Sequence, residues 1–161
     1  MTNHVLQKLV EMRSIETNYV DAWGNPATVS EDTKAKLLNV LGYDTSSEEA
    51  IETQIGDEAK NVWLSPLNPV QVNRVEDNIQ IAVRLPIELA NETYTLSVQT
   101  ESGESITHDI VPVDEELIHV AQIDDVEFHE YVVSFPQTLP MGYHTLSLTA
   151  KDDEDSIGSM R

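Results

Sequence analysis

The histidines are the residues of this chain whose chemistry would be easiest to recognise, because imidazole serves both as a general base and as a metal ligand. None of the five stands at metal-ligand spacing from another. His129-Glu130 begins like a zinc-helix motif, but Val133 stands where the second histidine would be. We therefore interpret the histidines on the expected strands as hydrogen-bonded or solvent-facing side chains; they are His108, His119, His129 and His144.

Acidic side chains are abundant, with 29 aspartates and glutamates against 9 lysines and arginines and a formal net charge of −20. This count leaves a glycosidase-type pair of carboxylates open, yet no motif places two of them in one cleft. The acidic run 152–155 lacks the alternating ligands and central glycine of a calcium loop, so we expect a solvated turn there. The chain has no cysteine and no glycine-rich phosphate loop. From the residues we therefore predict no catalytic residue, no metal ligand and no cofactor.

The negative charge narrows the classes of partner. It repels nucleic-acid phosphates and anionic lipids, and it argues against a DNA-binding module built from short helices and strands. No apolar segment approaches the length of a membrane span, and the N-terminus lacks the apolar run of a signal peptide. We therefore expect a cytoplasmic protein that binds neither nucleic acid nor membrane. A neutral partner such as a sugar remains open.

Trp23 and Trp63 are the side chains best suited to sugar binding, because an indole ring can lie against the apolar face of a pyranose. Each could instead be a hydrophobic anchor, Trp23 within the helical section of the chain and Trp63 at the boundary between sections. We favour the anchor role and keep both rings as stacking candidates.

Helical periodicity dominates the first 62 residues, beginning with apolar residues at helical spacing over 3–13. Ser30 is placed to cap a second helix that ends at Gly42. Ser46 and Glu49 form a capping box for a third helix. The stretch 23–26 predicts a turn between the first two helices. The buried face of the third helix should comprise Ala50, Ile51, Ile55 and Ala59.

Beyond a proline-punctuated boundary at 65–69 the hydrophobic period changes from that of a helix to that of a strand. Ser102-Gly103 predicts a hairpin turn. The fold class is α+β by count but mainly β: a small helical subdomain over residues 1–62, then an immunoglobulin-like antiparallel β-sandwich over residues 66–161. The expected strands lie near 79–85, 94–98, 106–110, 117–123 and 126–135, with no helical segment between them.

The stretch from Leu139 to Leu148 combines a tight turn with the start of a late strand. Pro140 and Gly142 suit the turn, and Tyr143 follows in a position similar to the corner tyrosine of immunoglobulin-like sandwiches. Residues 156–161 show neither a cap nor a completed strand. We therefore expect the last strand to be truncated and the chain to be part of a longer protein.

Two segments resemble the N-terminal region of bacterial 4-α-glucanotransferases of the amylomaltase (MalQ) type. The stretch 19–26, followed by 29–33 and Leu37-Leu38, is similar to the family's Tyr-x-(Asp/Asn)-Ala-x-Gly-(Lys/Asn)-Pro stretch and the capped helix after it. The stretch 139–148 is similar to the Leu-Pro-x-Gly-Tyr-His-Thr-Leu that closes the sandwich ahead of the catalytic barrel. Between the two, the chain follows the family only in hydrophobic pattern.

The resemblance implies a parent enzyme that disproportionates maltooligosaccharides by transferring α-1,4-glucan segments. Such retaining chemistry uses two carboxylates on a (β/α)₈ barrel, which needs about 250 residues and is absent here. No catalytic residue can therefore be carried over, and the chain alone should be inactive. Its expected partners are its own C-terminal barrel and an α-1,4-glucan, with Trp23 and Trp63 as candidates for glucan stacking. The alternative is a freestanding carbohydrate-binding or adaptor sandwich.

Overall fold

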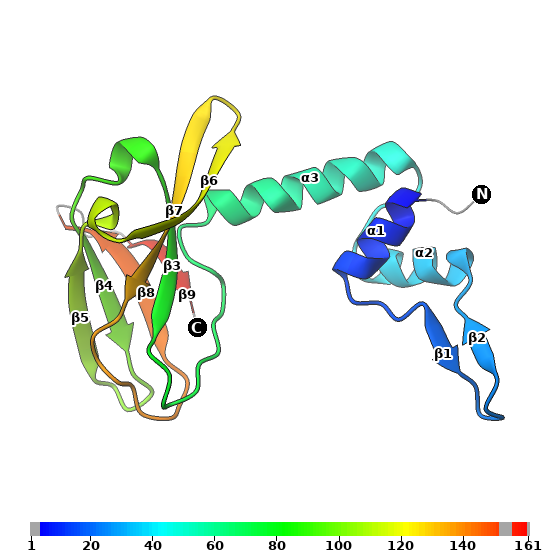
Figure 1. Cartoon of the computed structure of the whole chain (residues 1–161), viewed down its shortest axis with the longest axis horizontal. Coiled ribbons are helices and arrows are strands. Elements are labelled where there is room, and N and C mark those ends of the chain that lie inside the picture. Colours follow the sequence, from blue (N-terminus) through cyan, green and yellow to red (C-terminus); the bar gives the residue numbers. More distant parts are fainter. Residues whose placement is uncertain (1–3, 152–155, 161) are drawn as a thin grey trace. The chain divides into compact units, whose positions relative to one another are not determined.

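Three helices and a short hairpin come first along the chain and the remaining strands follow, as the computed structural model shows for residues 4–151 and 156–160 (Figure 1). Contacts between residues divide the chain into two units, 1–59 and 60–161, each described by itself below. The domain limits expected from the sequence, 1–62 and 66–161, stay a prediction. In the first unit and the start of the second lie α1 (His4–Met12), β1 (Asn18–Val20), β2 (Pro26–Thr28), α2 (Glu31–Val40) and α3 (Glu48–Leu64).

Helix α2 begins and ends where its sequence predicts. The Ser30 hydroxyl accepts a hydrogen bond from the Thr33 backbone N–H at 3.2 Å, which satisfies one of the free donors of the first turn. Glu31 and Asp32 follow in that turn, where the helix dipole favours negative charge. Gly42 closes the helix with a φ of 97°, a conformation that a side chain would strain.

Helix α3 differs from its sequence prediction at its start and on its buried face. Ser47, rather than Ser46, caps it, because the Ala50 N–H donates to the Ser47 hydroxyl at 3.1 Å. The Ser46 N–H is already bonded to Asp44. Ala59 was expected on the buried face but is exposed, whereas Ile51 is buried. The helix also runs on to Leu64, immediately before Ser65-Pro66.

The interior of the helical unit is small. Hydrogen bonds between side chains add to its stability: the Lys34 ammonium donates to Gln7 at 3.1 Å, and the Tyr43 hydroxyl donates to Glu58 at 2.5 Å. Arg13 pairs with the same Glu58 carboxylate and lies over the Tyr43 ring. The buried apolar side chains are Leu6, Leu9, Val10, Leu38 and Ile51.

The second unit is a β-sandwich whose strands are all antiparallel, which confirms the mainly β fold class. One sheet has the order β3-β7-β6 and the other β5-β4-β8-β9. Its strands are β3 (Gln80–Pro86), β4 (Tyr94–Gln99), β5 (Ser105–Ile110), β6 (Glu116–Ile123), β7 (Val126–Ser134), β8 (Thr145–Ala150) and β9 (Ser156–Met160), with short 3₁₀ turns η1 (Ile87–Leu89) and η2 (Pro112–Asp114).

Alternating side chains from both sheets fill the sandwich interior, as the period of two predicts. Ile81, Val83 and Leu85 of β3 face inward, and so do Tyr94, Leu96 and Val98 of β4. The β4–β5 hairpin turns at Gly103, which has a φ of 91°. The remaining core members are Leu67, Ile110, Val133, Phe135, Leu146, Leu148 and Met160.

The segment before β3 lies along the outer edge of that strand. The Arg84 N–H donates to the Pro66 carbonyl at 2.9 Å, and the Gln71 side chain donates to the Gln80 carbonyl at 2.8 Å. Two backbone groups at this edge of the sheet therefore have partners within the chain.

Residues 156–160 form a strand, β9, which pairs with β8 from Leu146↔Met160 to Thr149↔Ser156 with a register shift between Leu148 and Thr149. That the last strand is truncated stays a prediction. The expected corner role of Tyr143 is wrong. Tyr143 is 71% exposed, so its ring is not a corner tyrosine packed into the sandwich. The expected acidic turn 152–155 lies outside the described residues.

Candidate functional site

Trp23 is 85% exposed, at the tip of the hairpin that joins β1 to β2. The expectation that it anchors the helical section is therefore wrong. Tyr19 and Val20 on the same hairpin are 54% and 69% exposed. An exposed indole with a second exposed aromatic close by in sequence is suited to contact a flat, partly apolar ligand such as a sugar ring.

The turn that carries Trp23 is held from one side by Asp21. Its carboxylate accepts hydrogen bonds from the backbone N–H groups of Trp23 at 2.9 Å and Asn25 at 2.8 Å, and from the Asn25 amide. The Asn25 backbone N–H is the largest cause that keeps the pKa of Asp21 below its ordinary value. Gly24 takes a φ of 84°, which a side chain would resist. The backbone beneath the indole is thus fixed by its own sequence.

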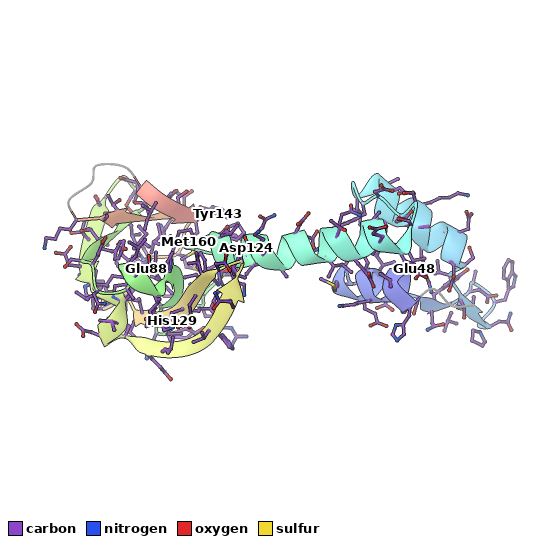
Figure 2. The ribbon with its side chains drawn as sticks, turned by 90° about the horizontal axis from the view of Figure 1, so that it is seen from above. Glu48, Glu88, Asp124, His129, Tyr143 and Met160 are labelled. Atoms are coloured by element: carbon purple, nitrogen blue, oxygen red, sulfur yellow. The ribbon has the colours of Figure 1, made fainter. Side chains whose placement is uncertain are left out.

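Trp63 is half-buried on the last turn of α3. Lys60, one turn earlier, pairs with Asp124 at the β6–β7 turn over 2.5 Å, which ties this end of the helix to the sandwich; Asp124 is labelled in Figure 2. The two tryptophans belong to different units of the chain, so each is judged by itself. Trp63 is partly buried, so the anchor role suits it better than it suits the exposed Trp23.

Charged side chains meet on the face of the β3-β7-β6 sheet that points away from the core. Arg84 on β3 stands opposite Glu130 on β7, and both are nearly buried, 8% and 7% exposed. The guanidinium lies 2.5 Å from the carboxylate and also donates to the Asn68 side chain at 3.0 Å. His119 of β6 donates to the second carboxylate oxygen at 2.7 Å.

Within the part of the chain that the structure describes, Glu130 is the one buried acid, and its partners are bases. A glycosidase pair needs a second carboxylate about 5–9 Å away across a cleft. A carboxylate held by an arginine and a histidine is instead a structural ion pair between strands. The arrangement gives no support to hydrolysis or transfer at this face.

His129, labelled in Figure 2, is a hydrogen-bonded core-side residue. One ring nitrogen donates to Glu127 at 2.7 Å, so the other accepts from the Tyr131 hydroxyl at 3.0 Å. His108 packs edge-on against Phe135. These contacts are structural, as the sequence interpretation proposes.

A groove of about 1240 Å³ opens at one end of the sandwich. Two segments without regular structure, 70–76 and 139–144, form its walls. Its floor consists of core side chains, among them Ile81, Val98 and Leu146. Met160, at the end of β9, also lines it. We refer to this feature as the end groove.

The 139–144 wall is held in one conformation by His144, which precedes β8 rather than lying on it as expected. Its Nδ1 accepts from the Glu101 N–H at 3.3 Å, so Nε2 carries the proton and donates to the Pro140 carbonyl at 2.8 Å. Glu101 in turn accepts from the Tyr143 N–H at 3.2 Å. A Cβ on Gly142 would stand 2.6 Å from the Glu101 carboxylate, which would have to move, and the φ of 152° would strain any other residue there.

The described residues contain neither a cluster of metal ligands nor a membrane-spanning helix. No group of three histidine, aspartate or glutamate side chains is gathered to hold a metal ion there. Over the same residues, no helix is long and apolar enough to cross a membrane.

Sequence reasoning named Trp23 but not its exposure, and it did not find the end groove or the Arg84–Glu130 pair. The groove joins two segments that are far apart in sequence, so no local pattern marks it. The ion pair depends on the register of three strands. In the sequence, the one signal of the groove is an apolar residue, Met141, between the turn residues Pro140 and Gly142; the structure shows it 85% exposed.

Comparison with known proteins covers nearly the whole chain. The family model of the MalQ N-terminal beta sandwich domain matches residues 66–161. The 4-alpha-glucanotransferases of Mycobacterium bovis and Mycobacterium tuberculosis are 26% identical over 151 residues, which is 94% of this chain and 20% of each relative. The crystal structure of amylomaltase from Corynebacterium glutamicum has a similar fold, with a TM-score of 0.73 and 23% identity over 99% of this chain and 22% of that one. The chain thus spans about a fifth of the length of these curated relatives.

Proposed function

The chain belongs to the family of MalQ N-terminal β-sandwich domains, and from this premise we propose that it is the non-catalytic N-terminal region of a 4-α-glucanotransferase. The observation that carries the proposal is the match between 94% of this chain and one fifth of the length of relatives named 4-alpha-glucanotransferase. The proposed parent transfers α-1,4-glucan segments between maltooligosaccharides. Its catalytic carboxylates would lie on a C-terminal barrel, the chain's principal partner, in the cytoplasm.

The described side chains support a non-catalytic role. Glu130, the buried acid, is engaged by Arg84 and His119. The other ion-paired carboxylates stand at exposed or half-buried positions on helices, strands and turns, such as the exposed Asp32 and Asp109. Lys151 and Thr95, which bond the Asp109 carboxylate, hold its pKa below the ordinary value, which makes it a poor proton donor.

Incubation of the pure chain with maltotriose tests the proposal. We expect no glucose and no longer oligomers by chromatography, whereas the longer protein encoded by the same reading frame should produce both. Transfer products from the pure chain, absent from a heat-treated sample, would overturn the non-catalytic role. A stop codon soon after Arg161 would overturn the parent enzyme.

We further propose that Trp23 stacks on α-1,4-glucan, with Trp63 as the second candidate. Full exposure, a fixed turn and the neighbouring Tyr19 support Trp23. The chain has two tryptophans, so the fluorescence of Trp63→Phe reports on Trp23 and that of Trp23→Phe on Trp63. Maltoheptaose should change the emission of Trp63→Phe with a dissociation constant of about 1 mM, as suits a single exposed ring.

The same titration of Trp23→Phe should leave the emission unchanged. A response that survives only in Trp23→Phe would transfer the role to Trp63. Saturation in neither variant would remove glucan binding from the proposal. Binding by Trp23, together with a reading frame that stops near Arg161, would favour the alternative of a freestanding carbohydrate-binding or adaptor module.

A further inference from the structure

The walls of the end groove carry apolar side chains that water surrounds. Val72 is 92% exposed and Met141 85%, and Tyr143, Val70 and Val75 are each more than half exposed. Scattered surface valines need no explanation, but this group lines one concavity whose floor is the sandwich core. A contiguous apolar surface of this kind marks a place where another surface binds.

We propose that the end groove is the docking surface for the polypeptide that follows Arg161 in the longer protein. This inference rests on the proposed function, because that function supplies the downstream chain. Docking would cover Met141 and Tyr143 and join the sandwich to the part of the enzyme beyond it.

The lining chemistry selects a protein segment over a glucan. Sugar sites offer aromatic faces for stacking, whereas Tyr143 is the one phenylalanine, tyrosine or tryptophan among the residues that line the groove; its polar lining includes Gln71, Arg74 and Glu76. The rest of the apolar lining is aliphatic or thioether, as in Val72 and Met141. Methionine adapts its shape to apolar partners, which is why it is common at protein-binding surfaces.

The exposed side chains stand on fixed backbone. His144 bridges the Glu101 N–H and the Pro140 carbonyl, and the Glu101 carboxylate bonds the Tyr143 N–H. On the opposite wall, the Gln71 side chain bonds the Gln80 carbonyl of β3. A wall that is already ordered loses little conformational entropy when a partner binds. The ordered backbone therefore favours docking, because less conformational entropy is lost when a partner covers these exposed apolar residues.

The path of the chain leads to the groove. Strand β9 runs antiparallel to β8, and its last described residue, Met160, is 8% exposed and lines the groove; Met160 and Tyr143 are both labelled in Figure 2. A chain that continues from Arg161 therefore starts beside this surface. Short covalent connection raises the effective concentration of a downstream segment at the groove. The curated relatives extend well beyond the matched fifth, which supplies such a segment.

A second copy of this chain is the competing occupant. Each copy carries a formal net charge of −20, so two copies repel one another at ordinary ionic strength. A downstream segment is instead held near the groove by its covalent connection to this chain, whatever its charge. The observations therefore favour the downstream polypeptide.

Thiol labelling tests the proposal without background from this chain, which has no cysteine. We would place Met141→Cys in the 161-residue chain and in the longer protein, and read alkylation at residue 141 by peptide mass spectrometry. The control is Val113→Cys in η2, which is 48% exposed and does not line the groove. Circular dichroism of each variant confirms that it is folded.

We expect Met141→Cys to react about tenfold more slowly in the longer protein than in the 161-residue chain, and Val113→Cys to react equally in both. Equal rates at residue 141 would overturn the proposal, as would equal protection at both positions. Protection in the 161-residue chain that grows with concentration would assign the groove to a second copy. A reading frame that stops near Arg161 removes the proposed function itself, whereas a continuing frame with an unprotected thiol removes only the docking site.

Discussion

The two units of this chain keep their folds by different means. Among the described residues, the sandwich closes its alternating strands around thirteen buried apolar side chains. The described part of the helical unit buries five, and it leaves Val40 86% exposed and Leu41 59% exposed at the end of α2. Its hairpin exposes Tyr19, Val20 and Trp23 as well. The sandwich therefore has a core of the size an independent domain needs, whereas the helical unit depends on a few apolar contacts and on polar ties such as Arg13–Glu58.

This difference in core size and apolar exposure indicates which surfaces of each unit should bind a partner and which unit should be the more stable. Large exposed apolar side chains in a unit with a small core point to a surface that a ligand or another protein surface covers. In the sandwich, apolar exposure gathers at the end groove and along β6. Four changes test how far the two units differ, beginning with the one that should matter most.

The largest difference should come from the same substitution placed in each core. Leu9→Ala and Leu96→Ala each remove a fully buried leucine, at a cost of about 2–5 kcal/mol. In the helical unit this cost is enough to unfold the unit, so the helical circular dichroism should fall at 25 °C. In the sandwich, Leu96→Ala should lower the unfolding temperature and leave the fold intact.

Thermal unfolding followed by NMR, with methyl signals from both units, gives the readout for this pair. If Leu9→Ala shifted the sandwich transition as much as the helical one, the two units would unfold together, and the comparison between them would be wrong.

Alkali should destabilise the sandwich through Tyr94. Burial, with a smaller contribution from the Glu92 charge, raises the pKa of Tyr94 to about 12 from its ordinary value of 10. The unfolded ring therefore loses its proton first, so stability that is complete below pH 10 is lost as the pH rises toward 12. We expect a loss on the order of 1–2 kcal/mol in urea unfolding of the sandwich.

Tyr94→Phe serves as its control, because it removes the ionisable hydroxyl and with it the hydrogen bond to the Leu89 carbonyl. This variant should start less stable and depend less on pH over the same interval. An equal alkaline loss in both proteins would assign the effect to other groups.

Gly142→Ala should destabilise the sandwich by about 2 kcal/mol, because the new Cβ displaces the Glu101 carboxylate and the backbone is strained. Gly103→Ala is the matched control in the same unit. It has a positive φ but open space around it, so strain alone applies, at about 1 kcal/mol. Differential scanning calorimetry compares them, and equal shifts would mean that the close approach to Glu101 costs nothing.

Gly56→Ala should produce the smallest change, and of opposite sign. The residue is an exposed interior position of α3 with ordinary backbone angles and nothing within 4 Å of an added Cβ. Alanine should stabilise the helix by about 0.5–1 kcal/mol. A higher melting temperature for the helical signal, with the sandwich transition unmoved, is the expected result. A lower one would show that the glycine has a role in α3 beyond its propensity.

The sandwich could be predicted closely from the sequence because its information is local. Each strand carries its own alternation, as in Tyr94, Leu96 and Val98, and the turn residues Ser102-Gly103 mark a hairpin that the structure confirms. The helix caps were predicted to within a residue for the same reason. Ser30 was right, and Ser46 was wrong by one position because its N–H already bonds Asp44.

The features that the sequence did not predict depend on contacts between distant residues, which no local sequence pattern indicates. The strands β1 and β2 have three residues each, too few to show an alternation. Trp23 was noticed as a residue type, but its exposure follows from the Asp21-braced turn beneath it. Distant segments build the end groove, and three strands in register bring Arg84, Glu130 and His119 together.

The segment that lies along β3 also protects the molecule from others like it. An open strand edge offers N–H and carbonyl groups on which a strand of another molecule can add, which is how sheets grow into aggregates. At β3, the Pro66 carbonyl accepts a hydrogen bond from the Arg84 N–H, and the Gln71 side chain donates one to the Gln80 carbonyl. Proline has no N–H with which to extend a ladder of its own. In a crowded, concentrated solution, these two occupied groups make strand addition at this edge of the sandwich less favourable.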